Sequence, residues 1–212
     1  MRKNPLAILI VLLMSINLNF SCDGRNNYYN DGNSDAINGI GELVDQTVDL
    51  ASFTKINLIG QSNISITKGD TQVIKIKAQQ NILDVMTHRV SNGEFIVGFE
   101  NNYKIGTNKG IFVDIITPSI ISDASISGVG KIVTCKGQQE SFNITISGAG
   151  TVESFDLITN NCSIVISGTG NCNVYANKKL NVTIAGVGKI SYKGHPDISQ
   201  NISGTGNINN AN

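Results

Sequence analysis

The sequence predicts an all-β fold, a β-solenoid (parallel β-helix-like) of stacked 18–20-residue coils with a less regular β-rich N-terminal part. Two observations predict it. Apolar residues alternate with small polar ones through the second half of the chain. A Gly-x-Gly pair interrupts this alternation at a nearly fixed spacing, because successive first glycines lie 20, 20, 18 and 18 residues apart. Such a period marks stacked supersecondary units that bury a core only together. The pairs are Gly128/Gly130, Gly148/Gly150, Gly168/Gly170, Gly186/Gly188 and Gly204/Gly206.

Each repeat predicts one strand before the glycine pair and a second strand after it, because strict alternation is typical of a half-buried strand. Two residues before the first glycine stand Ile126, Ile146, Ile166, Ile184 and Ile202. Four residues before it stand Ala124, Ile144, Ile164, Val182 and Gln200. The second strand begins at Ile132, Val152, Cys172, Ile190 and Ile208. We expect the two glycines to form the corner, where they permit positive φ and close backbone approach.

Two polar columns face outward in this arrangement, and stacked hydroxyls and amides could hydrogen-bond a glycan or a protein strand. The columns are Ser125, Thr145, Val165, Thr183, Asn201 and Asp123, Asn143, Ser163, Asn181, Ser199. Candidate binding residues are Asn143 and Thr145, together with the repeat tyrosines Tyr175 and Tyr192, since the chain has no Trp to serve as an aromatic platform. The alternative is that the columns only keep an exposed sheet soluble.

The N-terminus predicts export and lipidation. Arg2 and Lys3 precede the short apolar run 6–14, which is typical of a signal peptide over residues 1–21. The run leads to Leu18-Asn19-Phe20-Ser21-Cys22, which resembles a bacterial lipoprotein cleavage box, so Cys22 is the predicted lipid anchor. The alternative is an ordinary secretory signal with an incidental cysteine. Residues 22–42 predict a flexible tether and 43–212 the folded domain.

The part of the domain before the repeats is β-rich but lacks glycine corners. Strands are expected at 53–59, 63–67, 73–77, 94–99 and 111–117, with one helical turn at 81–86. The end coils of a solenoid must differ from the middle ones to close an exposed edge. This segment is therefore the predicted irregular start of the same structure.

Several motifs resemble the auto-transporter adhesin head GIN domain family, also called DUF2807. They are the opening F-x-K-I-x-L-x-G with N-I-S-I-T-K-G-D, the later N-I-L-D, the serial I-S-G-x-G, and the ending Y-K-G-H-P-D-I…I-S-G-T-G-N-I from Tyr192 to Ile208. The resemblance covers residues 48–212 and implies an all-β, solenoid-like envelope protein with adhesin function. It carries no defined catalytic residues. Where relatives often have Asp after the glycine pair, this chain has Lys131, Thr151, Asn171, Lys189 and Asn207.

Composition disfavours nucleic-acid binding, because 16 basic and 16 acidic residues give a net charge of zero and no arginine lies in the repeats. A carbohydrate-active enzyme on a β-helix scaffold is a rival hypothesis, but glycoside hydrolysis usually needs paired carboxylates. From Gly128 onward only Glu140, Glu153, Asp156 and Asp197 are acidic. We expect no cofactor and no metal site, and we expect both histidines, His88 and His195, in solvated turns.

Three cysteines remain besides Cys22. Cys162 and Cys172 fill columns otherwise occupied by large apolar residues, so we expect buried thiols that act as small hydrophobes. A Cys162–Cys172 disulfide is the alternative, and Cys135 completes an odd set.

The sequence as a whole predicts a non-catalytic lipoprotein of the cell envelope. We expect it to be held by lipid on the outer membrane of a diderm bacterium, facing either side, and to act as an adhesin or a glycan- or protein-binding module. The alternatives are a purely structural envelope protein and the enzyme described above.

Overall fold

The computed structural model describes residues 36–99 and 103–212, and the class is all-β as predicted. The predicted signal peptide, Cys22 and most of the predicted tether lie outside these residues. No helix in the described ranges is long and apolar enough to cross a membrane. Before the repeats the elements are β1 (Ala36–Asn38), β2 (Leu43–Val48), β3 (Lys55–Leu58), β4 (Gln61–Lys68), β5 (Val73–Gln79), α1 (Gln80–Leu83), β6 (Met86–Ser91), β7 (Glu94–Phe99), β8 (Lys104–Gly106) and β9 (Phe112–Thr117).

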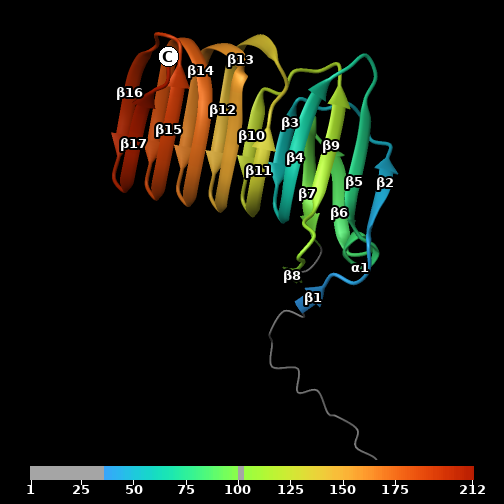
Figure 1. Cartoon of the computed structure of the whole chain (residues 1–212). Helices are drawn as coiled ribbons and strands as arrows, with labels where there is room; N and C mark the ends of the chain where they lie inside the picture. Colours follow the sequence, from blue (N-terminus) through green and yellow to red (C-terminus); the bar gives the residue numbers. More distant parts are fainter. Residues whose placement is uncertain (1–35, 100–102) are drawn as a thin grey trace, which may run out of the picture. The chain divides into compact units, whose positions relative to one another are not determined.

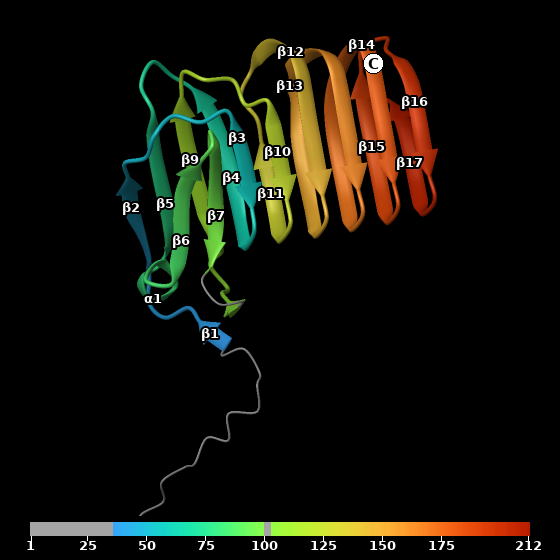
Figure 2. The ribbon, with the colours of Figure 1, turned by 180° about the vertical axis from the view of Figure 1, so that it is seen from behind.

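The repeats supply the remaining strands, and two of these are much longer than predicted. They are β10 (Asp123–Ile126), β11 (Val129–Val133), β12 (Gly137–Ile146), β13 (Ala149–Ile166), β14 (Thr169–Ile184), β15 (Val187–Lys193), β16 (Asp197–Ile202) and β17 (Thr205–Asn210). In Figures 1 and 2 they lie side by side in a row that runs on from the N-terminal strands. All belong to one curled, open sheet, in which β4 pairs with β11 and β3 with β10.

The curled sheet has two walls in the repeats. The strands that end at a first glycine form the pre-corner wall: β10, β12, the second halves of β13 and β14, and β16. The strands that follow it form the post-corner wall: β11, the first halves of β13 and β14, β15 and β17. Every pairing among these strands is parallel. We call one pre-corner strand with its following post-corner strand a rung.

Equivalent isoleucines of successive rungs stack in register, as predicted. Ile126 lies opposite Ile146, Ile146 opposite Ile166, and Ile166 opposite Ile184. All four are buried, while Ile202 of the last rung is 37% exposed. Parallel pairing at this period therefore places one apolar column inside the sheet, and the column ends in partial contact with solvent.

The first glycine of each pair is required by close backbone approach. The carbonyl oxygen of Gly148 accepts a hydrogen bond from Thr169 N at 2.9 Å, and a Cβ on Gly168 would overlap that same oxygen. The corresponding bonds join Val187 N to Gly168 O and Thr205 N to Gly186 O, each at 2.9 Å. Any side chain here would separate two rungs, so the corner tolerates only glycine.

The expectation that both glycines form the corner is wrong for the second one. The second glycines all lie within post-corner strands and not between strands: Gly130, Gly150, Gly170, Gly188 and Gly206. In the last four of these a Cβ would meet isoleucine side chains of the core. Among the first glycines of the pairs none has a positive φ. In these four rungs the second glycine therefore makes room for a large neighbour inside the sheet, and close packing explains the motif.

Gly130 differs from the other second glycines, although it too is a strand residue and not the predicted corner. It lies in β11 opposite Ser62 of β4, and a Cβ on it would overlap the Ser62 carbonyl oxygen. Its φ of 154° is positive, which no other second glycine shares. The expected positive φ and close backbone approach thus occur together at Gly130, where the first rung meets the N-terminal strands.

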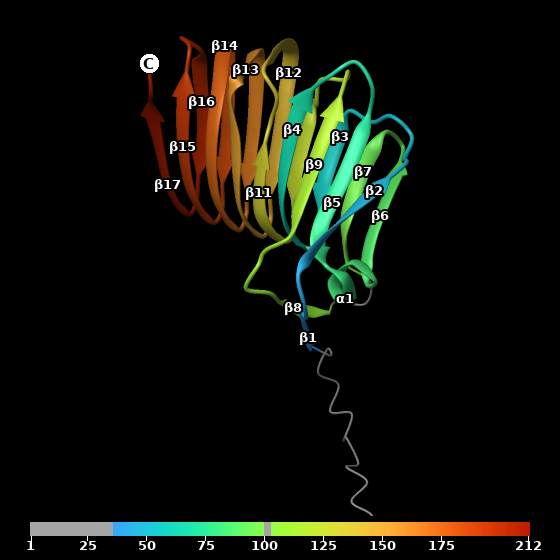
Figure 3. The same ribbon diagram turned by 45° about the vertical axis from the view of Figure 1, so that its right-hand side comes forward.

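The N-terminal part uses antiparallel pairs in addition to parallel ones. β2 pairs with β5, β5 with β9, and β6 with β7, all antiparallel, and Figure 3 shows β4, β9, β5 and β2 in succession. Three strands were not predicted in this segment, β2, β6 and β8, and β1 lies in the range assigned to the tether. His88 and Arg89 lie in β6, so the prediction of a turn there is wrong.

Candidate functional site

The outward face of the pre-corner wall carries the two predicted polar columns. Asn143 lies between Asp123 and Ser163, and Thr145 lies between Ser125 and Val165. Asn143 donates from Nδ2 to Asp123 Oδ1 at 3.0 Å. Asn143 and Thr145 are exposed and two residues apart on β12, so both project from the same face. The structure thus brings these two predicted residues together on an almost uncharged surface.

A polar pocket of about 290 Å³ opens at the beginning of the same wall. We call it the amide pocket, because four of its six lining residues carry side-chain amides. The lining is Gln138, Gln139, Ile158, Thr159, Asn160 and Asn177. Two lining groups are held in place: Gln139 donates to Ile121 O at 2.9 Å, and buried Thr159 donates to Tyr175 O at 2.7 Å.

The amide pocket adjoins the carboxylate of Glu140, which two side-chain amides contact. Glu140 accepts from Asn160 Nδ2 at 2.5 Å through Oε2 and from Asn161 Nδ2 at 3.1 Å through Oε1. These bonds orient both amides. Gln138 and Asn177 are exposed and project their donors and acceptors toward solvent.

The amide pocket did not emerge from the sequence because its residues fall outside the repeat columns. The pairing of β13 with β14 shifts between Ser154 and Ile158 and again between Thr159 and Asn161. Such irregularities change the direction of the side chains, so the residues can no longer be matched from rung to rung by their spacing in the sequence. The only signal in the sequence is the local density of Gln and Asn around 138–139, 160–161 and 177.

The two predicted tyrosines do not form an aromatic platform. Tyr192 lies opposite Val174 and packs against the core. Tyr175 lies opposite Lys193 on one side and Ile158 on the other, and its ring edge faces Gly194. Consecutive positions of a strand point to opposite faces, so the rings lie on different sides of the sheet. Tyr175 alone adjoins the amide pocket, through the bond from Thr159 to its carbonyl.

The post-corner wall carries an ion pair and a cation–aromatic contact. Lys131 and Glu153 form an ion pair at 2.8 Å, and Lys193 Nζ lies 4.7 Å from the centre of the Phe155 ring. Glu153 and Asp156 line one hollow of about 290 Å³ with Lys193. The two acids that the enzyme hypothesis would pair are therefore neighbours, but Glu153 is already bound to a lysine.

The three described cysteines are free and buried, and no Cys162–Cys172 disulfide forms. Cys162 lies between Phe142 and Leu180 in the apolar column, as expected of a small hydrophobe. Burial raises the pKa of Cys162 to about 12 and raises the pKa of Cys172 further. These thiols stay protonated and inert in the folded protein.

The histidines occupy different settings. His88 is half-buried in β6, and desolvation lowers its pKa. His195 is exposed in the bend that follows β15, as predicted. Within the described ranges no three His, Cys, Asp or Glu side chains are grouped so as to hold a metal ion.

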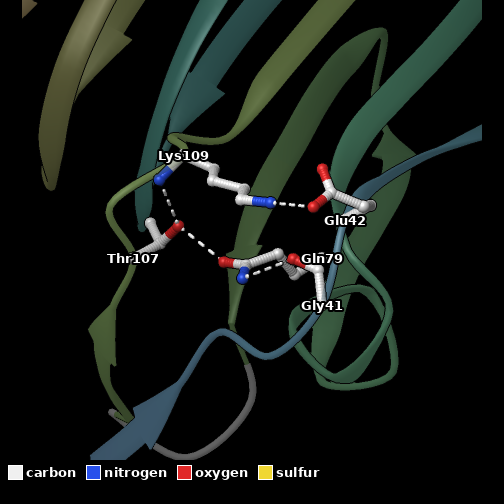
Figure 4. Close-up of polar contacts among 5 residues, drawn as sticks. All are labelled: Gly41, Glu42, Gln79, Thr107 and Lys109. Carbon is white, nitrogen blue, oxygen red and sulfur yellow. Dashed lines mark hydrogen bonds and ion pairs between the residues drawn. The ribbon is translucent and has the colours of Figure 1, made fainter.

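A polar clasp fastens the N-terminal segment to the loop before β9 (Figure 4). Buried Gln79 donates from Nε2 to Gly41 O at 3.1 Å and accepts from Thr107 Oγ1 at 2.8 Å. Lys109 pairs with Glu42 at 2.7 Å, and Lys109 N donates to Thr107 Oγ1 at 3.1 Å. The clasp is structural, because its groups satisfy one another rather than face an open cavity.

Comparison with known proteins agrees with this architecture. A crystal structure described as a putative adhesin from Bacteroides fragilis matches with a TM-score of 0.52 at 21% identity, over 82% of this chain and 100% of that one. That likeness shows the fold alone. Two structures from Parabacteroides distasonis, described as a putative lipid binding protein and a putative adhesin, match with TM-scores of 0.47 and 0.40. Their identities are 16% and 17%, and each match covers 84% of this chain and 100% of the other.

No protein of curated function matches the sequence. A family model described as "Putative auto-transporter adhesin, head GIN domain" matches residues 52–134 and 122–196, which together span most of the described repeats and the strands before them. The chain therefore belongs to the head GIN domain family, DUF2807.

Proposed function

We propose that this chain is a non-catalytic adhesin module of the cell envelope that binds a neutral glycan along its pre-corner wall. The amide pocket is the main contact in this proposal, and Asn143 and Thr145 extend the contact along β12. The observation that supports it most is the neutral, amide-lined pocket opening onto a ladder of hydroxyl and amide side chains.

Sugar hydroxyls are both donors and acceptors, and side-chain amides offer both functions at once. Gln138 and Asn177 supply such groups free of the hydrogen bonds that hold Asn160 and Asn161 to Glu140. The lining of the amide pocket has no charged side chain, whereas a charged lining would favour an ionic partner over an uncharged sugar.

We further propose that the scaffold is a β-solenoid whose coils are the rungs. The support is the parallel pairing of all strands from β10 to β17 and the isoleucine column, which stays in register through it. A rigid stack of identical strands presents its outward side chains at the strand spacing of about 4.8 Å. Such a surface suits an extended chain of repeating units.

Lipid anchoring through Cys22 completes the proposal and would place the binding wall at the end of a tether on the outer membrane. Palmitate labelling of the wild-type chain and of Cys22→Ala tests this directly. Label on the wild type alone supports the anchor, and equal absence of label from both shows an ordinary secretory signal.

Binding of the purified chain to an array of neutral and charged glycans tests the main proposal. We expect Gln138→Ala combined with Asn177→Ala to weaken binding by about thirtyfold, since each change removes hydrogen bonds worth about 1 kcal/mol. Asn171→Ala is the matched control, because Asn171 is an exposed amide on the post-corner wall. A chain that binds no glycan would favour the purely structural alternative, whereas turnover of a bound polysaccharide would favour the enzyme.

A further inference from the structure

The last rung leaves both its backbone edge and part of its apolar face uncovered. β16 pairs only with β14, and β17 only with β15, in the described part of the chain. Ile198 and Ile202 of β16 are 42% and 37% exposed, whereas Leu180 and Ile184, their partners one rung earlier, are fully buried. An uncovered edge of this kind is a template for another strand.

This edge lacks the features that usually keep an exposed edge from pairing. Residues 197–212 contain no Lys, Arg or Pro, and their one charged side chain is Asp197 at the start of β16. The opposite end of the sheet differs, because its edge strands are β2, whose Asp45 pairs with Lys77 at 3.3 Å, and β6, which exposes Arg89. Charges on edge strands oppose pairing with a further strand. The C-terminal edge is thus the one suited to receive a strand.

The sequence of β16 is self-complementary. Gln200 lies opposite buried Val182 and so occupies an inward position, with Ile198 and Ile202 inward on either side of it. An antiparallel copy centred on Gln200 would place each Ile198 against the other copy's Ile202 and the two Gln200 amides against each other. The pattern apolar–polar–apolar reads the same in both directions, which is what a two-fold axis requires.

The same axis also suits β17. Asn207 lies as far after the Ser203-Gly204 corner as Gln200 lies before it, so the axis that centres β16 on Gln200 centres β17 on Asn207. It would place each half-buried Ile208 opposite the other copy's Gly206. A large side chain then meets a position without one, and the two apolar faces close over each other.

We propose that two copies of this chain pair end to end through β16 and β17, by antiparallel strand addition about a two-fold axis at Gln200. Each β16 supplies the strand that the other lacks, and the isoleucine column continues across the joint. The pairing closes as a dimer instead of growing into a filament, because the charged β2 and β6 edges end the other side of the sheet.

A single cysteine at the axis tests the geometry. Directly opposed residues of antiparallel strands have Cα atoms about 4.5 or 5.5 Å apart, which a disulfide can bridge. The full chain carrying Gln200→Cys should form a disulfide-linked dimer under mild oxidation. Thr183→Cys is the matched control, since Thr183 is exposed on the same wall one rung earlier and should remain monomeric. The unsubstituted chain shows what its own cysteines contribute.

A charge at the axis provides the second measurement. Gln200→Lys places two like charges opposite each other, which disfavours cross-strand pairing, while a lysine on an exposed edge is compatible with folding. Light scattering on the full chain in detergent should give twice the chain mass of 22.6 kDa for the wild type and a single mass for Gln200→Lys.

A monomeric wild type, equal cross-linking at positions 200 and 183, a cross-link to a different protein, or open-ended oligomers would each overturn the proposal. The glycan measurements are independent of this result, because the residues of the amide pocket belong to β12, β13 and β14 and none of them to β16 or β17.

Discussion

The N-terminal strands and the glycine repeats continue one core but pair in different ways. The repeats use parallel neighbours alone, and the residues around each glycine corner pair in the same register from rung to rung. The N-terminal part adds three antiparallel pairs and one helical turn, α1, whose Ile82 and Leu83 are buried. Strand pairing is therefore regular only where the strands on both sides belong to the repeat.

The difference shows what is needed to end such a sheet. At the N-terminal end large side chains fill the core, with the rings of Phe53 and Phe95 stacked at 5.1 Å between centroids. The antiparallel strands β2 and β6 then form the edges of the sheet, and both expose charged side chains. The C-terminal end keeps the repeat pattern to its last strand and so leaves isoleucine exposed. A repeating sheet can bury its apolar column at an end only if the last strands depart from the repeat, and a sheet that keeps the repeat to its last strand leaves that column exposed.

The glycine corner should be the most sensitive point of the repeats. Gly168→Ala would place a methyl group on the Gly148 carbonyl oxygen, and neither backbone can move without opening the rungs. We expect a loss of about 4 kcal/mol in the free energy of unfolding, measured by urea titration. The control is Gly137→Ala at the start of β12, away from a corner, where the new methyl meets the end of the Ile120 side chain at 3.2 Å. We expect less than about 1 kcal/mol there, and equal losses would refute the role assigned to the carbonyl ladder.

The position of a rung should decide how much its isoleucine contributes. Ile166→Ala removes a fully buried side chain from a middle rung, and such deletions typically cost about 3 kcal/mol. Ile202→Ala makes the same change in the last rung, where the side chain is partly exposed, and should cost about 1 kcal/mol. Urea midpoints at low protein concentration measure both. A larger loss at Ile202 that grows with protein concentration would point to the end-to-end dimer.

Much of the repeat region could be predicted, because the same residue type recurs at the equivalent position of several rungs. The isoleucine column and the buried thiols follow from alternation repeated over rungs, and one exception does not hide the pattern. The role of the second glycine could not be predicted, because the sequence alone does not say which neighbour approaches it. Core isoleucines such as Ile126 and Ile146 approach it within the repeats, whereas the Ser62 carbonyl of β4 approaches Gly130.

The N-terminal part and the amide pocket were less predictable, because their residues do not recur at equivalent positions along the chain. β6 contains the polar run Thr87-His88-Arg89, and only its antiparallel pairing with β7 makes it a strand. Tertiary pairing overrides local propensity in such segments. The amide pocket depends on register shifts between β13 and β14, which the spacing of residues in the sequence does not indicate. Candidate binding residues on regular strands could be placed from the sequence, whereas the pocket beside them could not.

Alkaline pH should weaken the repeats selectively. Cys162 has an ordinary thiol pKa near 9.0 in the unfolded chain and about 12 when folded, so the unfolded state loses its proton first as the pH rises. Stability is then complete below pH 9 and falls through pH 12, by about 1.4 kcal/mol for this thiol at pH 10. Cys172 shifts in the same direction. Replacing both residues with Val should flatten the fall between pH 8 and pH 10, and an unchanged slope would contradict the assignment.

The ion pairs of the two regions should matter least. Lys109–Glu42 belongs to the N-terminal clasp and Lys131–Glu153 to the post-corner wall, and each has at least one partner well exposed to solvent. Screening and side-chain entropy limit such pairs, so Lys109→Met and Lys131→Met should each cost under about 0.5 kcal/mol and less still in high salt. The hydrogen bonds of buried Gln79 remain in the first variant and keep the clasp closed. A loss above about 1 kcal/mol for Lys109→Met alone, measured by urea titration at low and high salt, would mean that this charge and not Gln79 holds the N-terminal segment in place.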